Sequence, residues 1–113
     1  MAQYAILLYS PAPADPMDMG PEDMEAHEVF QKEVSERNIE ILNPQALTPS
    51  TDARAVKDGT VTDGTFVEAK EVLAGFFFVE ADSVDEATEI AKLVPTKKGG
   101  GVEVRPVFVP PSE

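Results

Sequence analysis

Two side chains of this 113-residue sequence are candidates for acid–base chemistry, His27 and Asp63. His27 is the only histidine, and imidazole takes up and releases protons near neutral pH, as a general base or acid must. The carboxylate of Asp63 could orient that imidazole, as the third group of a catalytic triad does, or accept a proton from a substrate. Both residues therefore have a functional interpretation.

Each candidate also has a structural interpretation. At 100° per residue His27 falls in one arc with Phe30 and Val34, which predicts an imidazole at the edge of the core, bonded to a backbone carbonyl. Asp63 precedes Gly64 at the end of an expected strand, where aspartate often bonds its own turn. The residues alone leave both interpretations open.

Further charged residues admit two interpretations as well. Glu68, Lys70 and Glu71 have the pattern of a solvated strand. Lys70 could instead bind a substrate carboxylate or pair with a glutamate between two copies of the chain, and we favour the pair. For Arg105 we favour a cross-strand pair with a carboxylate over an anion site.

The glycine-rich segment 97–101 could cradle an anion through its backbone N–H groups, as such loops do before a helix. A strand is expected to follow instead, which favours a flexible connector. One histidine and scattered carboxylates do not form a spaced set of metal ligands. The absence of cysteine excludes disulfides and thiolate sites. We expect no metal and no cofactor.

The charge of the chain excludes some partners. Nine Lys and Arg stand against 21 Asp and Glu, a formal net charge of −12. Nucleic acid and anionic membranes are bound through clustered cations, and only Lys97 and Lys98 are adjacent. No basic start or long apolar run suggests a leader or a membrane span. We therefore expect a cytoplasmic protein that binds neither nucleic acid nor membrane.

The first half of the chain predicts a strand, a helix and an edge strand. The β-rich run 3–9 ends at prolines. Pro21 and two acidic residues predict the start of a helix that runs to about Arg37 and ends at Asn38. The residues of this helix expected to face the core are Asp23, Ala26, His27, Phe30 and Val34. Residues 39–47 predict a second strand, at an edge or bulged because Pro44 interrupts it.

The second half predicts a hairpin, a strand, a helix and a last strand. Asp58-Gly59 suits a type I′ turn between 54–57 and 60–62. The apolar run 72–81 predicts a central strand. A capping box from Ser83 to Glu86 starts a helix that Pro95 stops, with Val84 and Val94 among its buried residues. The alternating run 102–109 predicts a last strand at an edge.

This order predicts one α+β domain over residues 1–113, a ferredoxin-like βαβ-hairpin-βαβ with an antiparallel sheet. In that plan the helices cover only one face of the sheet. Part of the apolar run 76–79 lies on the other face, and a second copy of the chain is its simplest cover. We therefore expect a homodimer.

The stretch 63–76, which opens Asp63-Gly64-Thr65-Phe66, resembles the Asp-Gly-Pro-Phe signature of the YCII-related, or DGPF-domain, family. The likeness continues through 80–87, the glycine-rich loop and 102–107, with Thr65 in place of the usual proline. The resemblance implies a dimeric α+β barrel, in which two ferredoxin-like sheets pack face to face. It also implies a pocket between the sheet and the helices of each protomer.

For function, the resemblance implies two alternatives. A histidine early in the first helix of YCII proteins has been proposed with an aspartate as a catalytic pair, which here implies His27 and Asp63. A related dehalogenase acts on chlorinated muconolactones, so the first alternative is a cofactor-free acid–base enzyme acting on a small lactone or carbonyl compound. Other members are encoded beside sigma factors. The second alternative is a non-catalytic ligand-binding or accessory module, linked to transcription regulation.

Overall fold

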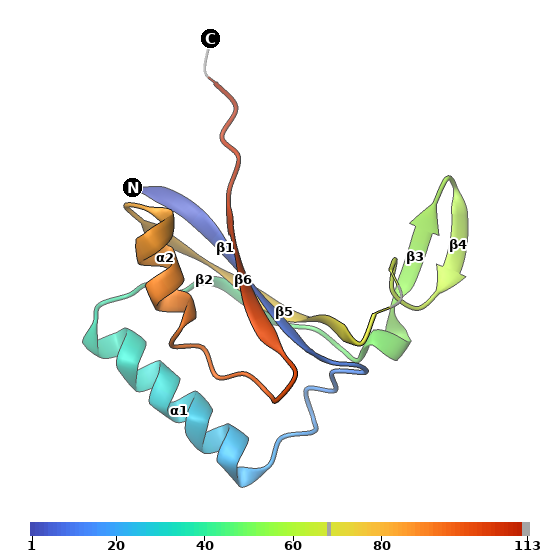
Figure 1. Ribbon diagram of the computed structural model, residues 1–113, viewed down its shortest axis with the longest axis horizontal. Coiled ribbons are helices and arrows are strands. Elements are labelled where there is room, and N and C mark those ends of the chain that lie inside the picture. The colour runs from blue at the N-terminus through green and yellow to red at the C-terminus, as the bar shows by residue number, and fades with distance from the viewer. Residues whose placement is uncertain (68, 112–113) are drawn as a thin grey trace.

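The computed structural model describes residues 1–67 and 69–111. Its main sheet has four antiparallel strands in the order β2-β5-β1-β6 (Figure 1). These are β1 (Ala2–Pro11), β2 (Leu42–Ala46), β5 (Glu71–Ala81) and β6 (Gly101–Pro106). The two strands with the longest apolar runs, β1 and β5, lie in the middle.

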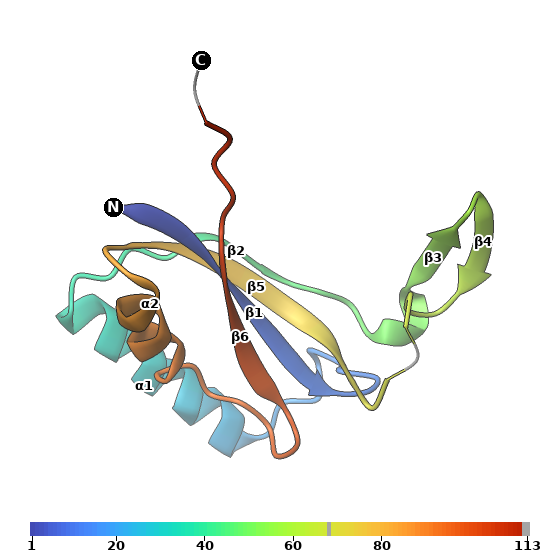
Figure 2. The same cartoon turned by 45° about the horizontal axis from the view of Figure 1, so that its top comes forward.

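Two helices complete the main body, α1 (Pro21–Glu36) and α2 (Val84–Ala91). Both lie on the same side of the sheet, below it in Figure 2. Two helices on one face of an antiparallel sheet, with this strand order, form a ferredoxin-like α+β fold. The predicted fold class is confirmed.

The inner face of the sheet, toward the helices, carries the core. Alternation along the strands sends Ile6 of β1 and its partners Phe77 and Val104 to that side. Ile6 and Val79 are fully buried, with no exposed surface. The buried core cluster joins strands and helices and consists of Tyr4, Ile6, Phe30, Val34, Phe77, Val79, Ala81, Ala87, Ile90, Ala91 and Val94.

The inserted hairpin lies away from this body, at the right of Figure 1. Strands β3 (Arg54–Lys57) and β4 (Thr60–Asp63) form their own two-stranded sheet, after a short 3₁₀ helix, η1 (Ser50–Asp52). Asp58 and Gly59 take φ values of 51° and 81°, as the predicted type I′ turn requires.

The edge strand β2 is shorter than predicted. It begins at Leu42 instead of residue 39, and its pairing with β5 is irregular between Leu42 and Gln45. Asn43, just before Pro44, has a φ of 49°. The proline therefore interrupts the ladder where the sequence placed the break, and the edge position is confirmed.

Helix α1 follows the prediction at its ends and departs from it in burial. Pro21 is its first residue, and Asn38 beyond its end has a φ of 55°. Only Phe30 and Val34 of the helix are buried. The prediction that His27 belongs to the core is wrong, because the first half of α1 lies away from the sheet and leaves this side chain exposed.

Helix α2 starts where predicted and ends earlier. The Ser83 hydroxyl accepts a hydrogen bond from the backbone N–H of Glu86 at 3.1 Å. The helix ends at Ala91, and tighter turns, with Val94 N–H bonded to Ala91 C=O at 3.1 Å, carry the chain to Pro95. Val94 is buried as predicted, whereas Val84 at the exposed start is 46% accessible.

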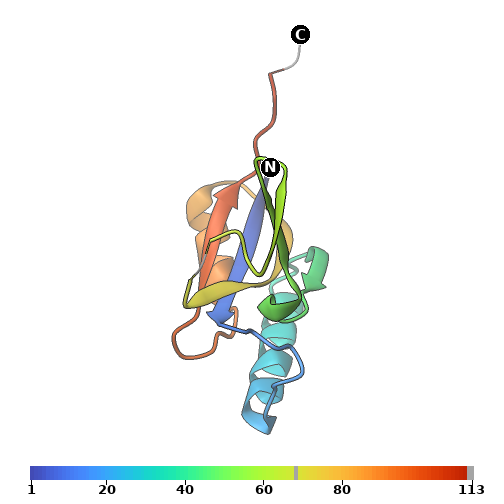
Figure 3. The ribbon, with the colours of Figure 1, turned by 90° about the vertical axis from the view of Figure 1, so that its right-hand side faces the viewer.

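The last strand is also shorter than predicted. It ends at Pro106, and one more bond joins Val107 N–H to Gln3 C=O at 3.0 Å. In this register only Gln3 and Ala2, the first two residues of β1, remain opposite the rest of the alternating run. The chain after β6 leaves the sheet (Figure 3). Phe108 and Val109 in that segment are 80% and 75% exposed.

No helix within residues 1–67 and 69–111 has both the length and the apolar composition to cross a membrane.

The cap of α2 gives a first test. We expect Ser83→Ala to lower the free energy of unfolding by about 1 kcal/mol, because the N–H of Glu86 loses its partner. Urea denaturation measures the change. The control is Ser35→Ala on the exposed side of α1, where alanine should be neutral or slightly stabilising. Equal midpoints for the two variants would contradict the capping role.

Candidate functional site

A cleft lies where the first half of α1 stands away from the sheet. It consists of two adjoining cavities of about 390 Å³ and 350 Å³, here called the outer and the inner cavity. Both are lined by Ser10, His27, Ala74, Pro95 and Thr96. The cleft is therefore continuous across these residues, and its combined size suits a small organic molecule.

The inner cavity is mostly apolar and lies between α1 and strands β1, β2 and β5. Phe30 on α1 and Phe77 on β5 contribute two aromatic rings with centroids 6.1 Å apart. A minority of the lining residues are polar, and these include His27, Gln31 and Gln45. The apolar lining residues include Leu8, Phe30, Ile41, Pro44, Phe77, Val94 and Pro95.

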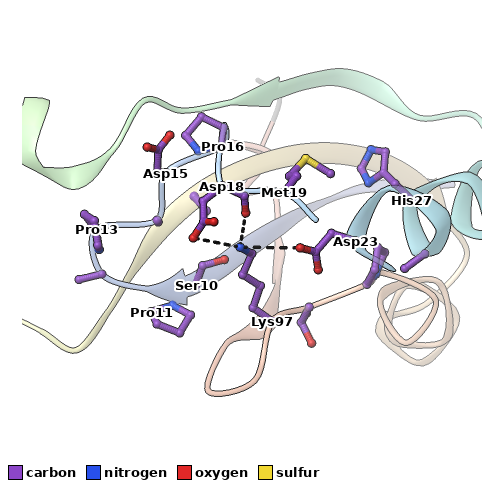
Figure 4. A pocket seen from close by; sticks show the side chains of 16 residues that line it. Ser10, Pro11, Pro13, Asp15, Pro16, Asp18, Met19, Asp23, His27 and Lys97 are labelled. Carbon is purple, nitrogen blue, oxygen red and sulfur yellow. Dashed lines mark hydrogen bonds and ion pairs between the residues drawn. The ribbon is translucent and has the colours of Figure 1, made fainter. Parts of the chain in front are cut away.

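The outer cavity differs from the inner one in its charged groups and is bordered by the loop 12–20 between β1 and α1. Three carboxylates and one ammonium group line it, from Asp15, Asp18, Asp23 and Lys97 (Figure 4). Asp23 is half-buried at the first turn of α1, whereas Asp15 and Asp18 are exposed. The charged side chains that line this cavity are thus predominantly negative.

Lys97 connects the loop to the helix. Its ammonium group bonds the backbone carbonyl of Asp18 and lies 3.7 Å from the Asp18 carboxylate and 3.9 Å from that of Asp23. Figure 4 shows the side chain pointing between these two residues. The Asp23 carboxylate also accepts a hydrogen bond from Gly20 N–H at 3.0 Å, so it caps α1.

His27 lies on α1 one turn after Asp23 and borders both cavities. Its ring is 6.3 Å from that of Phe30, at an interplanar angle of 48°. Within the described ranges no hydrogen bond reaches either ring nitrogen. The expected bond to a backbone carbonyl is therefore not made, and the imidazole nitrogens are available to a ligand.

The structure does not bring Asp63 to His27 within one copy of the chain. Asp63 ends β4, pairs with Arg54 in the hairpin ladder and is exposed. The hairpin lies well apart from α1 in both Figure 1 and Figure 2. Asp63 lines neither cavity of the cleft.

The other charged candidates also lie outside the cleft. Lys70 precedes β5, Glu71 is its first residue, and both are exposed. Glu68 falls outside the described residues. Arg105 pairs with Glu103 at 3.0 Å. The predicted carboxylate partner is thus found two residues away on the same strand instead of across it.

The sequence analysis missed the acidic residues of the outer cavity, and it interpreted Lys97 only as part of a glycine-rich loop. That segment is a turn, with Gly100 N–H bonded to Lys97 C=O at 2.8 Å, and it leads into β6 as a connector. The position of these acidic residues in the chain could have indicated the site, because the loop 12–20 joins the carboxyl end of a buried strand to a helix. Loops at strand ends often form ligand sites.

A metal site finds no support in the arrangement of side chains. Across the part of the chain that the structure describes, no three His, Asp or Glu residues are grouped as metal ligands would be. The carboxylates of the outer cavity are instead engaged with Lys97 and with backbone N–H groups.

The chain matches the model of a known protein family. The family model of the YCII-related domain matches residues 20–110. No curated protein matches the chain significantly. β1 lies before the matched residues, although it pairs with both β5 and β6 at the centre of the sheet.

The contacts of Lys97 predict a local role. We expect Lys97→Met to speed amide hydrogen exchange in the loop 12–20, because the loop loses its tie to α1. Global stability should fall by less than about 1 kcal/mol, since the side chain is 39% exposed. The matched control is Lys92→Met, which breaks only an exposed pair with Glu89 on α2. Unchanged exchange in the loop would show that Lys97 does not hold it.

Proposed function

The chain belongs to the YCII-related domain family, and on that premise we propose a homodimeric small-molecule-binding protein in which His27 exchanges protons with the ligand. The observation that carries the proposal is the position of His27 on both cavities of the cleft. A ligand in either cavity would meet the imidazole. Acid–base chemistry on a small lactone or carbonyl compound is the function best supported.

In this mechanism the inner cavity holds the apolar body of the ligand beside Phe30 and Phe77. His27 takes a proton from the carbon next to the carbonyl group, and the electron pair of that C–H bond moves toward the carbonyl oxygen. The protonated imidazole then returns the proton at a second position. Imidazole is suited to both steps near neutral pH.

A second candidate is a ligand-binding module without catalysis. It is favoured by the placement of Asp63, which leaves His27 without the orienting carboxylate that acid–base pairs normally use. The proposed pair of His27 and Asp63 would need Asp63 from a second copy of the chain. In the non-catalytic case His27 contributes only a polar contact.

The proposed homodimer rests on the outer face of the main sheet, which carries no helix. Opposite residues Leu7 and Phe76, and Ala5 and Phe78, point to that face, because their neighbours Ile6 and Phe77 are in the core. The Phe76 and Phe78 rings meet edge to face, with centroids 6.2 Å apart. Apolar side chains from the central strands thus form a continuous surface that a second copy would cover.

We also propose that one domain includes β1 as well as the matched residues 20–110. The reason is the pairing of β1 with two strands of the matched region. Without β1 the sheet would lose one of its two central strands and the buried side chains of Tyr4 and Ile6.

Light scattering tests the homodimer. The chain should have a mass in solution of twice 12.2 kDa. Phe78→Asp should reduce the mass to that of one chain, because a carboxylate on the outer face would be buried without a partner. The control is Val29→Asp, at an exposed position of α1 with 57% accessibility, which should leave the dimer intact. A single-chain mass for the unmodified protein would refute the proposal.

Exchange of carbon-bound protons tests the acid–base role without a known reaction. In D₂O the protein should accelerate deuterium incorporation next to the carbonyl group of a small lactone that binds in the cleft. We expect His27→Gln to reduce that acceleration by a factor of about 10² to 10⁴. Glu28→Gln, a neighbour that lines neither cavity, is the control. Binding without acceleration by the unmodified protein would favour the non-catalytic candidate.

A further inference from the structure

The charges around the cleft define the class of ligand that it can hold. We infer that the cleft accepts molecules with a compact apolar body and an uncharged or cationic polar end, and that it discriminates against carboxylates. This inference rests on the proposed binding role of the cleft. It concerns the chemistry of the ligand and does not depend on whether His27 is catalytic.

The inner cavity sets the apolar requirement. Its volume is about 350 Å³, and the rings of Phe30 and Phe77 form part of its wall. Among the described residues that line it, none is a Lys, Arg, Asp or Glu. A charged group placed there would lose its hydration without gaining an ion pair. The polar end of a ligand must therefore point toward the outer cavity.

The outer cavity sets the charge requirement. Asp15, Asp18 and Asp23 line it against a single cation, Lys97. The negative charge of the whole chain adds to this local excess. A carboxylate at the end of a ligand would approach groups of its own sign, whereas an ammonium group would be attracted.

Two features of the outer cavity would ordinarily attract an anion, and the chain's own carboxylates already use both. The first is Lys97, whose ammonium group faces Asp18 and Asp23 at 3.7 and 3.9 Å. The second is the positive end of the α1 dipole, where Gly20 N–H bonds the Asp23 carboxylate at 3.0 Å. An anionic ligand would have to displace these carboxylates.

Isosteric probes test the inference. Phenylacetate and phenylacetamide have nearly the same shape and differ by one charge, and 2-phenylethylamine supplies a cation on the same ring. Binding is followed at constant pH through the ring signals of His27, which are free of overlap because the chain has no other histidine. We expect saturable shifts with the amide and the amine, and at least about tenfold weaker binding of the carboxylate.

A variant then assigns the discrimination to the outer cavity. Asp18→Asn removes one negative charge and releases part of the hold on Lys97, so it should strengthen phenylacetate binding severalfold and leave phenylacetamide unchanged. Glu89→Gln is the matched control. It makes the same change in net charge on the exposed side of α2, and it should affect neither ligand.

The possible results separate the two levels of the proposal. Preference for the amide and the amine, with relief by Asp18→Asn, supports the inference. Phenylacetate binding as tightly as phenylacetamide overturns the inference and leaves the cleft as a binding site. No saturable shift with any of the three probes overturns the binding role of the cleft, and the inference with it. Equal effects of Asp18→Asn and Glu89→Gln would assign the discrimination to overall charge and overturn the role of the outer cavity.

Discussion

The contact between Phe30 of α1 and Phe77 of β5 is the interaction on which the site depends. Their rings lie 6.1 Å apart, and Phe30 is the first residue along α1 that is buried. The two aromatic side chains, with their ring planes tilted by 44°, hold the helix at a distance from the sheet. Before Phe30 along α1 nothing of that size fills the space, so the cleft opens and His27 lies on its border. The same contact that completes the core thus creates the cavity.

The distribution of the helices has a second consequence. Because α1 and α2 cover the inner face, the side chains that alternate with the core residues along β1 and β5 remain on an open apolar surface. A sheet with helices on one side cannot bury both faces within one chain. The ferredoxin-like plan therefore gives the two faces different surroundings: the inner face shapes the cleft, and the outer face is the one that the proposed homodimer would cover.

Local signals were predictable from sequence, and long-range geometry was not. The Asp58-Gly59 turn, the Ser83 cap and the break at Pro44 depend on a few adjacent residues, and each is found where expected. The predicted last strand failed beyond Pro106, where only the first two residues of the partner strand β1 remain although the alternation continues. A repeating pattern in one segment carries no information about the length of its neighbour.

The candidate site shows the same limit. Helical periodicity placed His27 toward the interior, but only the tertiary distance between α1 and the sheet decides whether that direction is filled. Lys97 reaches Asp18 across 79 residues of sequence, and no local motif encodes that meeting. Asp63 was selected from a signature, whereas the carboxylates beside the cleft come from a loop that carries no recognised motif.

The central position of β1 bears on how the protein is made. On the ribosome this strand emerges before its neighbours β5 and β6, which are synthesised only after α1, β2 and the β3–β4 hairpin. Until then the apolar side chains of β1 have no sheet to join, while the β3–β4 hairpin can close as soon as it emerges, because its two strands are adjacent in sequence. β1 is thus fully paired only after every other strand of the sheet has been made. Until then the nascent chain must keep this aggregation-prone segment unpaired.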